Sequence, residues 1–437
     1  MIKNVALRFY IFAFILGAGL VCSSCGTVCN PAGGSGTGTA AVIGRTGGAD
    51  AGQPHALLTP AQASSTCPVG GGGGSNCSST QTPNEVLYTL DGLGNVIVYA
   101  IDSNGNLTLT CTKATAATSG VLAVSTPQAA TNFLYVLDTS KAQIFGFIIS
   151  HGKTVTLTPV NGSPFQFTDA TIDPFSFIET DPLGRFVFVT DFTGGQIHVF
   201  KIQAGAGSLT EAAGSPFTDI GNPNYLAVSN NGNFAYAPDP VAGDIFILSI
   251  SATGTLTPTS ASPFLISSGP NDSPHFDAVS ANGNFLYTAD AGSVSGFTID
   301  SSTGNLALIP GSTIDTSVFS VSPSLFAIDS TGAFMYAADS STDTNNTGIL
   351  GFSLDSTTGA ISAGQVQGSP FDGTNIISWL ASNPAGPQLF VLSEPGSKAT
   401  GLDINRFGIT LSSGALTAPT SPSTLSGAFN IAIANVQ

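Results

Sequence analysis

The octapeptide "GNFAYAPD" at residues 232–239 recurs along the chain and decides the fold. It joins a glycine turn to a short strand rich in aromatic and small residues, and it closes on aspartate. Clear copies are "GRFVFVTD" (184–191), "GNFLYTAD" (283–290) and "GAFMYAAD" (332–339), and weaker ones are "NEVLYTLD" (84–91), "TNFLYVLD" (131–138) and "PQLFVLSE" (387–394). Seven copies with a period of about 50 residues predict a propeller or a solenoid.

Each repeat unit divides into four short strands. In one unit, "YLAVS" (225–229) precedes the octapeptide, and "DIFILSI" (244–250) and a final strand beyond the turn "ATGTL" (252–256) follow it. The segments are rich in β-branched and aromatic residues and are bounded by Gly, Asn, Asp and Pro, whereas no stretch has a helical period. We therefore predict an all-β fold, a seven-bladed β-propeller of four-stranded blades over residues 84–437.

The tetrapeptide "GSPF" stands at the end of several units, at residues 162–165, 214–217 and 368–371, with "ASPF" at 261–264 and the variant "GSTI" at 311–314. Proline removes a backbone donor from a β-ladder. We therefore expect pairing of the outermost strand to stop at this proline, with the phenylalanine packing against the next blade.

The two ends of the repeat region complement each other. The first unit has no apolar strand before its octapeptide, while the segment "FNIAIANVQ" (429–437) matches "YLAVS" without a unit of its own. Pairing this C-terminal strand into the first blade would close the ring and remove two exposed strand edges.

The N-terminal residues predict export. Lys3 and Arg8 flank the start of an apolar run over residues 9–21, as in a signal peptide that covers residues 1–25. Cys25 in "VCSSCG" resembles the acylated cysteine of bacterial lipoproteins. We expect an exported protein of the cell envelope that contacts a membrane only through a lipid on Cys25, in the periplasm or on the outer membrane, with simple secretion as the alternative.

Residues 26–83 are Gly/Ser-rich and lack periodicity, which predicts a flexible tether. An exported protein folds in an oxidising compartment, where disulfides persist. The cysteines outside the predicted signal peptide are Cys29, Cys67, Cys77 and Cys111. Their spacing leaves the pairing open. It does not match a zinc site, and we expect neither a metal nor a cofactor.

The charge balance limits the partners. Ten Lys and Arg stand against 26 Asp and Glu, a formal net charge of -16, and only 8% of residues are charged. A nucleic acid or an anionic membrane surface would be repelled on average. We expect a monomer whose partner is a protein, a glycan or a small lactone at the mouth of the central channel.

The octapeptide copies and the "TG-x-L" or "TG-x-I" turns at Gly254, Gly304 and Gly359 resemble the YVTN-type β-propellers and the lactonase family that is similar to 6-phosphogluconolactonase. The resemblance covers residues 84–437. It implies hydrolysis of a sugar lactone, in which a base activates water. Pro274-His275 in "SPHFDAVSANG" and Glu394 are similar to site residues of that family, although no Arg lies beside either.

One column of residues stands out without reference to any family. Aligning the predicted inner strands brings together Ala432, Ala123, Ala227, Ala278, Ala327 and Ala381, with Glu179 as the seventh member. A carboxylate at this crowded position is costly unless it faces the channel or is hydrogen-bonded, and desolvation would raise its pKa toward that of a useful base. The candidate catalytic residues are Glu179, His275 and Asp277. A hydrogen-bonded structural carboxylate and a structural histidine are the alternatives.

Two functions follow. The mostly apolar inner strands and the scarcity of His and Arg favour a binding scaffold for a protein or glycan ligand. The alternative is a hydrolase that opens an unphosphorylated sugar lactone in the channel. No G-x-S-x-G elbow is present, so the common serine-esterase mechanism is excluded.

Overall fold

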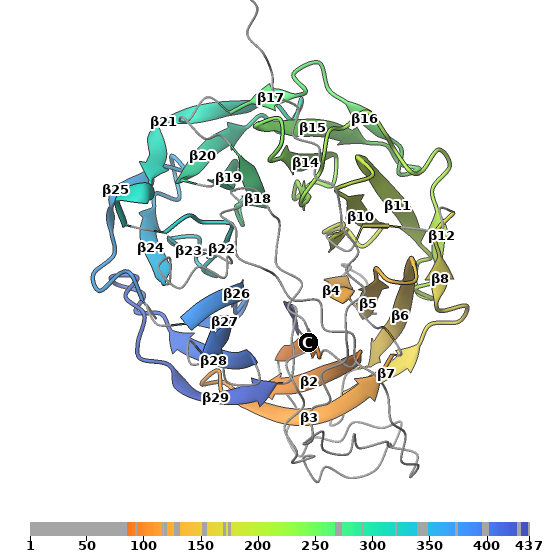
Figure 1. Cartoon of the computed structure of the whole chain (residues 1–437), viewed down its shortest axis with the longest axis horizontal. Coiled ribbons are helices and arrows are strands. Elements are labelled where there is room, and N and C mark those ends of the chain that lie inside the picture. The colour runs from red at the N-terminus through yellow and green to blue at the C-terminus, as the bar shows by residue number, and fades with distance from the viewer. Residues whose placement is uncertain are drawn as a thin grey trace, which may run out of the picture.

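The structure is a computed structural model in which seven antiparallel sheets surround a central axis (Figure 1). It describes residues 85–91, 94–115, 117, 120–125, 132–150, 155–168, 172–173, 176–266, 273–290, 292–319, 321–338, 348–371, 375–395, 402–425 and 430–435. The predicted signal peptide, Cys25 and the predicted tether lie outside these residues. No helix in the described part of the chain is long and apolar enough to cross a membrane.

The first three blades begin with the blade that joins the two ends of the propeller. Blade one comprises β30 (Ile431–Asn435), β1 (Glu85–Leu90), β2 (Asn95–Ile101) and β3 (Leu107–Ala114). Blade two comprises β4 (Gly120–Ser125), β5 (Asn132–Asp138), β6 (Gln143–Ser150), β7 (Thr156–Pro159) and β8 (Phe165–Gln166). Blade three comprises β9 (Ile178–Thr180), β10 (Phe186–Asp191), β11 (Gln196–Ile202) and β12 (Leu209–Glu211).

The remaining four blades repeat this order from the axis outward. Blade four comprises β13 (Ala227–Val228), β14 (Phe234–Asp239), β15 (Asp244–Ile250), β16 (Leu256–Pro258) and β17 (Phe264–Leu265). Blade five comprises β18 (Pro274–Val279), β19 (Phe285–Asp290), β20 (Ser293–Ile299) and β21 (Leu306–Asp315), followed by the short 3-10 helix η1 (Ser317–Phe319). Blade six comprises β22 (Leu325–Ile328), β23 (Phe334–Ala338), β24 (Ile349–Leu354) and β25 (Ile361–Gln365), and blade seven comprises β26 (Asn375–Ser382), β27 (Gln388–Pro395), β28 (Leu402–Gly408) and β29 (Thr420–Leu425).

The C-terminal strand closes the ring as predicted. β30 pairs antiparallel with β1, with Ala432 opposite Tyr88. The Thr89 hydroxyl adds a hydrogen bond of 2.9 Å to the carbonyl of Asn430. Blade one is therefore built from both ends of the propeller, and the innermost edge of β1 is paired.

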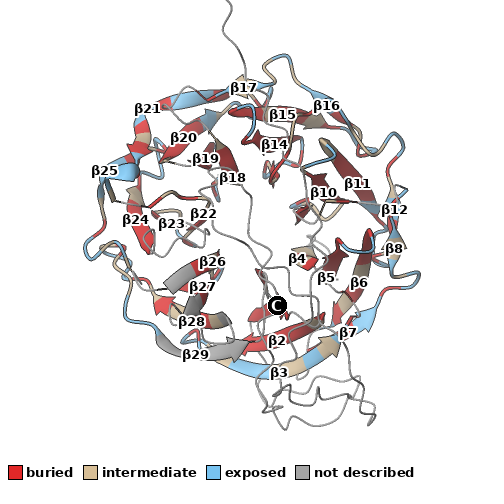
Figure 2. Ribbon diagram, in the orientation of Figure 1, coloured by how far each residue is buried: buried red, intermediate tan, exposed pale blue. Residues whose placement is uncertain are grey.

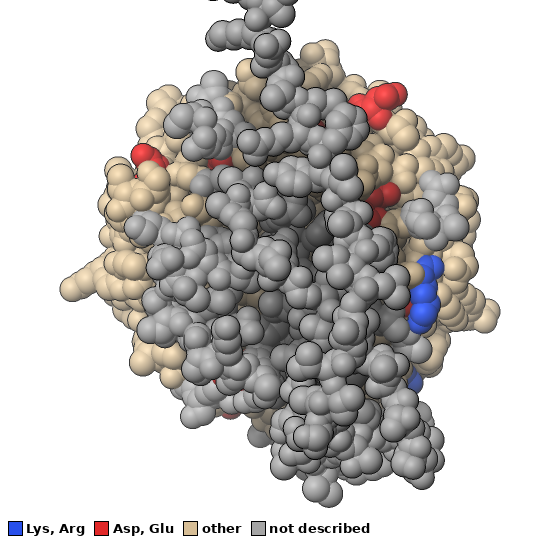
Figure 3. Space-filling view, in the orientation of Figure 1, with Lys and Arg blue, Asp and Glu red and all other residues tan. Residues whose placement is uncertain are grey.

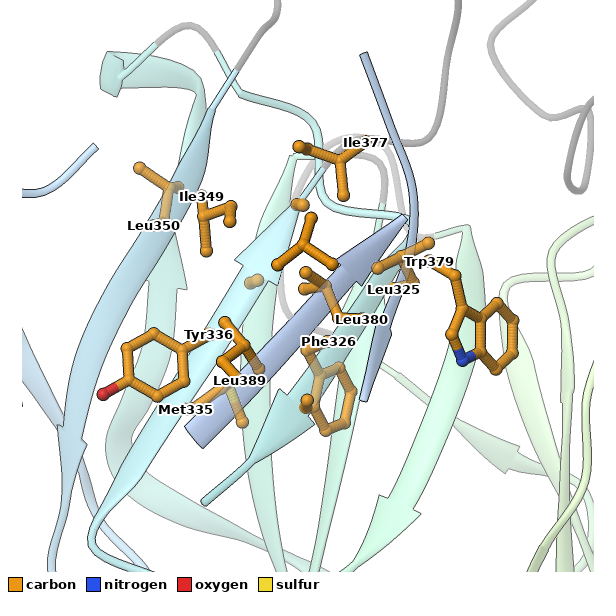
Figure 4. Close-up of a cluster of buried hydrophobic side chains, with 14 of the residues drawn as sticks. Leu325, Phe326, Met335, Tyr336, Ile349, Leu350, Ile377, Trp379, Leu380 and Leu389 are labelled. Carbon is orange, nitrogen blue, oxygen red and sulfur yellow. The ribbon is translucent and has the colours of Figure 1, made fainter. Parts of the chain in front are cut away.

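The core lies between the blades. The second strand of each blade is buried on both faces, whereas the outermost strands carry the exposed positions (Figure 2). Between blades six and seven, Met335 and Tyr336 of β23 pack in one cluster with Leu380 of β26 and Leu389 of β27 (Figure 4). Burial of such faces between sheets supplies most of the driving force for folding.

The "F-x-Y" part of the octapeptide links blades two, four, five and six each to the following blade. In blade four, the Tyr236 hydroxyl donates to the carbonyl of Gly304 in the "TG-x-L" turn of blade five. A Cβ atom at Gly304 would lie 2.5 Å from the Phe234 ring, and φ there is +75°, so only glycine fits. The same hydroxyl-to-carbonyl bond joins Tyr135 to Gly207, Tyr287 to Gly359 and Tyr336 to Gly414.

The prediction that strand pairing stops at Ser-Pro was wrong. The serine hydroxyl accepts a hydrogen bond from the third strand, as Ser262 Oγ does from the Ile247 amide at 3.0 Å, and the phenylalanine then resumes pairing, with Phe264 opposite Ile245. The Ser-Pro bond is cis in all four copies. The motif therefore interrupts the outermost strand for a few residues. Where "GSTI" replaces it, β21 runs through as one strand with a bulge.

Candidate active site in the central channel

The predicted inner column exists and is in register. Each of its seven members lies directly opposite the aromatic residue of the neighbouring second strand, namely Ala432 with Tyr88, Ala123 with Tyr135, Glu179 with Phe188, Ala227 with Tyr236, Ala278 with Tyr287, Ala327 with Tyr336 and Ala381 with Phe390. Glu179, on β9, is therefore the one carboxylate at a position where every other blade places a methyl group.

Two donors hold the Glu179 carboxylate. The Thr180 amide donates to Oε1 at 2.8 Å, and the Tyr225 hydroxyl, from the start of blade four, donates to Oε2 at 3.0 Å. Burial raises the pKa of Glu179 to about 6, and the two hydrogen bonds oppose that rise. At neutral pH the group is therefore ionised and more basic than an ordinary glutamate.

Glu179 faces a pocket of about 190 Å³ in the channel. Its polar and aromatic lining residues are Phe177, Glu179, Tyr225, Trp379 and Asn430, and its aliphatic ones are Ala123, Val124, Ile178, Ile431, Ala432 and Ile433. Drug-sized ligands usually occupy pockets of about 300 Å³ or more. The size of this pocket suits a smaller molecule.

Aromatic side chains from five blades meet across the channel. Phe177 stacks on Trp379 with ring centroids 5.8 Å apart and an interplanar angle of 17°, and it meets the edge of Tyr225 at 5.3 Å. Phe276 contacts Tyr225 at 4.2 Å and Phe326 at 5.2 Å. These rings pack on one another, so each wall of the pocket is held by its neighbours.

Asp277, on β18, is fully buried, and neither of its carboxylate oxygens has a hydrogen-bond partner among the described residues. Thr288 lies opposite it, but the Thr288 hydroxyl donates to the Phe276 carbonyl at 3.3 Å. Burial raises the pKa of Asp277 to about 7, and the nearby Thr288 hydroxyl opposes that rise. Burial, and then the charges of Glu179 and of Asp277, raise the pKa of Tyr225 well above its usual value, so this phenol stays protonated between the two acids.

His275 does not line the pocket. Its side chain is buried, its Nδ1 atom has no partner among the described residues, and burial lowers its pKa, so the ring is neutral at neutral pH. Its backbone carbonyl accepts a hydrogen bond of 2.8 Å from the Asn224 amide group. The structure therefore places Glu179 and Asp277 beside Tyr225, whereas His275 is not among the residues that line the pocket.

The remaining charged candidates lie elsewhere. Arg185 directly precedes β10, and its guanidinium donates at 2.5 Å to both the Asp181 carboxylate and the Gly232 carbonyl, so it joins blades three and four. Glu394 lies opposite Ile376 in β27, and its side chain is outside the described part. Cys111, on β3, is disulfide-bonded, while the other five cysteines fall outside the described residues.

The aromatic residues that line the pocket were not predicted from the sequence. Phe177, Tyr225 and Trp379 each stand two positions before a member of the inner column, and Trp379 is the sole tryptophan of the chain. Because alternate residues of a strand share a face, a second column two residues upstream would have pointed to them. The unique tryptophan was a further signal.

The surroundings of the pocket are poor in cations. None of its lining residues is Lys or Arg, and charged side chains are sparse on the described part of the face in Figure 3. No group of three His, Cys, Asp or Glu among the described residues is placed to hold a metal ion. The chemistry of the pocket thus rests on Glu179, Tyr225 and the aromatic rings.

Comparison with known proteins agrees with this architecture. The family model described as "Lactonase, 7-bladed beta-propeller" matches residues 62–365. No curated protein sequence matches the chain.

Solved structures share the fold. A periplasmic gluconolactonase of Pseudomonas aeruginosa is 16% identical, with a TM-score of 0.61 over 80% of this chain and 100% of that one. A 6-phosphogluconolactonase candidate from Bacteroides fragilis is 18% identical, with a TM-score of 0.61 over 82% of this chain and 100% of that one. At these identities the likeness concerns the fold alone, whereas the family model spans well over half of the sequence. The chain belongs to the lactonase family of seven-bladed β-propellers.

Proposed function

We propose that this propeller hydrolyses a small unphosphorylated sugar lactone in the channel pocket, with Glu179 as the general base. The observation that carries the proposal is the position of Glu179, which replaces alanine in an otherwise uniform column and faces a pocket. Family membership and the gluconolactonase named among the structural neighbours favour hydrolysis over the binding-scaffold interpretation.

The reaction needs a proton acceptor beside the lactone carbonyl. Glu179 would take a proton from water as the water oxygen bonds to the carbonyl carbon, the ring C–O bond would then break, and the proton would pass to the leaving ring oxygen. Each Glu179 oxygen accepts one hydrogen bond from the protein and keeps a lone pair for this water. Tyr225 acts as a positioning residue, because its hydroxyl fixes the orientation of the carboxylate.

An unphosphorylated substrate fits the charges. No Lys or Arg lines the pocket, and the formal net charge is -16, so a sugar phosphate would meet repulsion without a cationic partner.

The test is initial-rate hydrolysis of a panel of aldonolactones by the purified propeller. We expect turnover of at least one unphosphorylated lactone, with kcat/KM rising through a pH near 6 as Glu179 ionises. Glu179→Gln should lose most of this turnover. Glu211→Gln is its matched control, since it replaces another blade-three glutamate, one that bonds His198 and Ser215 away from the pocket. Absence of turnover across the panel would reject the proposal.

We also propose that the protein acts in the cell envelope as a monomer anchored through Cys25. The signal-peptide-like residues 1–25 and the lipoprotein-like "VCSSCG" support this location. Cell fractionation tests it, because the wild-type protein should sediment with membranes whereas Cys25→Ser should not.

A further inference from the structure

The pocket contains a half-buried anion without a counter-ion. Glu179 forms no ion pair with any described residue, and its two hydrogen bonds come from a neutral amide and a neutral phenol. Removing a carboxylate from water without a cationic partner is costly, and the cost is recovered when a cation occupies the site.

Three aromatic residues share that pocket. Phe177, Tyr225 and Trp379 line it together with Glu179, and the stacked pair Phe177 and Trp379 is locked by the edge-on Tyr225. Aromatic faces attract cations through their quadrupole, with tryptophan the strongest, and they do so most effectively for alkylated ammonium groups, which are weakly hydrated. The other lining residues are mainly aliphatic and would contact methyl groups.

Anionic ligands find no cationic partner in this pocket. None of its lining residues is Lys or Arg. An anion would approach Glu179 and a chain of net charge -16. The size of the pocket, its aromatic lining and its negative charge thus all favour a small cation.

We infer that the channel pocket binds a small organic cation with an alkylated ammonium group, whose charge pairs with Glu179 and whose methyl groups contact Phe177, Tyr225 and Trp379. The inference rests on the geometry of the pocket and is independent of hydrolysis. Because both roles use Glu179, a bound cation should also inhibit lactone hydrolysis competitively.

The sole tryptophan is an intrinsic fluorescent probe of the pocket. Trp379 lies in the wall, so tryptophan emission of the full chain comes from this site alone. We expect choline to change the emission saturably. The neutral alcohol in which carbon replaces the nitrogen of choline has almost the same shape and serves as the matched ligand. It should bind at least about tenfold more weakly, because it lacks the charge.

Variants separate the cation site from a merely apolar pocket. Glu179→Gln should weaken choline binding by about thirtyfold or more and leave the neutral alcohol unaffected, whereas Glu211→Gln should change neither. Tyr225→Phe keeps the aromatic face and should retain the preference for choline. Calorimetry of the same variants, with thermal melts to verify folding, gives a second readout of binding. Equal binding of choline and the alcohol, or no saturable response to choline, would overturn the inference.

Discussion

The second strands and the innermost strands share one register but differ in how closely their sequences repeat. Second strands carry an aromatic anchor opposite the inner column in all seven blades, and four of these anchors donate to a glycine carbonyl of the next blade. The inner strands keep the alanine column in six blades, and the positions two residues upstream vary from Val121 to Trp379.

This difference distinguishes the positions that hold the blades together from the positions that can carry a functional site. A position that must contact the next blade meets much the same neighbour in every repeat and is constrained alike, whereas the positions that face the axis meet one another across the channel and need not be alike. The axis is therefore where a repeat protein can depart from its pattern at least cost to the fold, and Glu179 with its aromatic neighbours is such a departure.

Closure of the ring gives the largest expected effect on the frame. Deleting residues 429–437 removes β30, which exposes the edge of β1 and leaves blade one with three strands. We expect thermal unfolding to lose its cooperativity, which differential scanning calorimetry would measure. Deleting residues 30–66, which contain no cysteine and so leave the disulfide of Cys111 intact, is the control and should leave the melting temperature nearly unchanged. Equal effects of the two deletions would contradict the closed-ring account.

The buried acid Asp277 gives the next largest effect. Its pKa of about 7 in the folded protein lies above the ordinary 3.8, so the folded state holds a proton that the unfolded chain releases at lower pH. Stability from this group is present below about pH 4 and is lost as pH rises to 7, by at most roughly 4 kcal/mol.

Asp277→Asn should therefore match the wild type at pH 4 and be more stable at pH 8, as measured by urea unfolding. Asp315→Asn is the control with the opposite sign, since the Ser317 hydroxyl and amide lower the pKa of Asp315, so its loss should destabilise above pH 4. A wild-type stability that does not fall between pH 4 and 7 would argue against the buried, unpartnered carboxyl.

The interblade tyrosines give a smaller effect. Tyr236→Phe removes the 3.1 Å bond to Gly304 with little change of shape and should cost about 1 kcal/mol in the free energy of unfolding. Blade three carries Phe188 at the same position and lacks this hydroxyl, so Phe188→Tyr should regain a similar amount. Chemical denaturation of both variants measures these changes. An unchanged free energy of unfolding in Tyr236→Phe would mean that the bond is dispensable.

The sequence predicted the parts of the molecule that repeat. Blade number, closure by residues 429–437 and the inner column with Glu179 follow from aligning the copies, because every unit obeys the same packing constraints. The role of Ser-Pro was misread, since a strand that pauses and resumes has the same pattern as one that ends.

The pocket was harder to predict for a physical reason. Tyr225, Phe177 and Trp379 come from three different blades, and nothing in the local sequence of one blade shows which ring it meets across the axis. The partnerless Asp277 was named as a candidate, but its burial and its proximity to Tyr225 became apparent only with the blades assembled.

The central claim is that Glu179 serves chemistry and not the frame, and Glu179→Gln tests it most directly. The glutamine carbonyl can still accept from the Thr180 amide, and its NH2 group can donate to the Tyr225 oxygen once that hydroxyl rotates. Glutamine cannot act as a base, so lactone turnover should fall by roughly 10²–10⁴-fold. At pH 8 the melting temperature should be unchanged or higher, because no buried charge remains. Unchanged turnover in a variant that melts at a lower temperature would show that Glu179 is structural and would contradict the account.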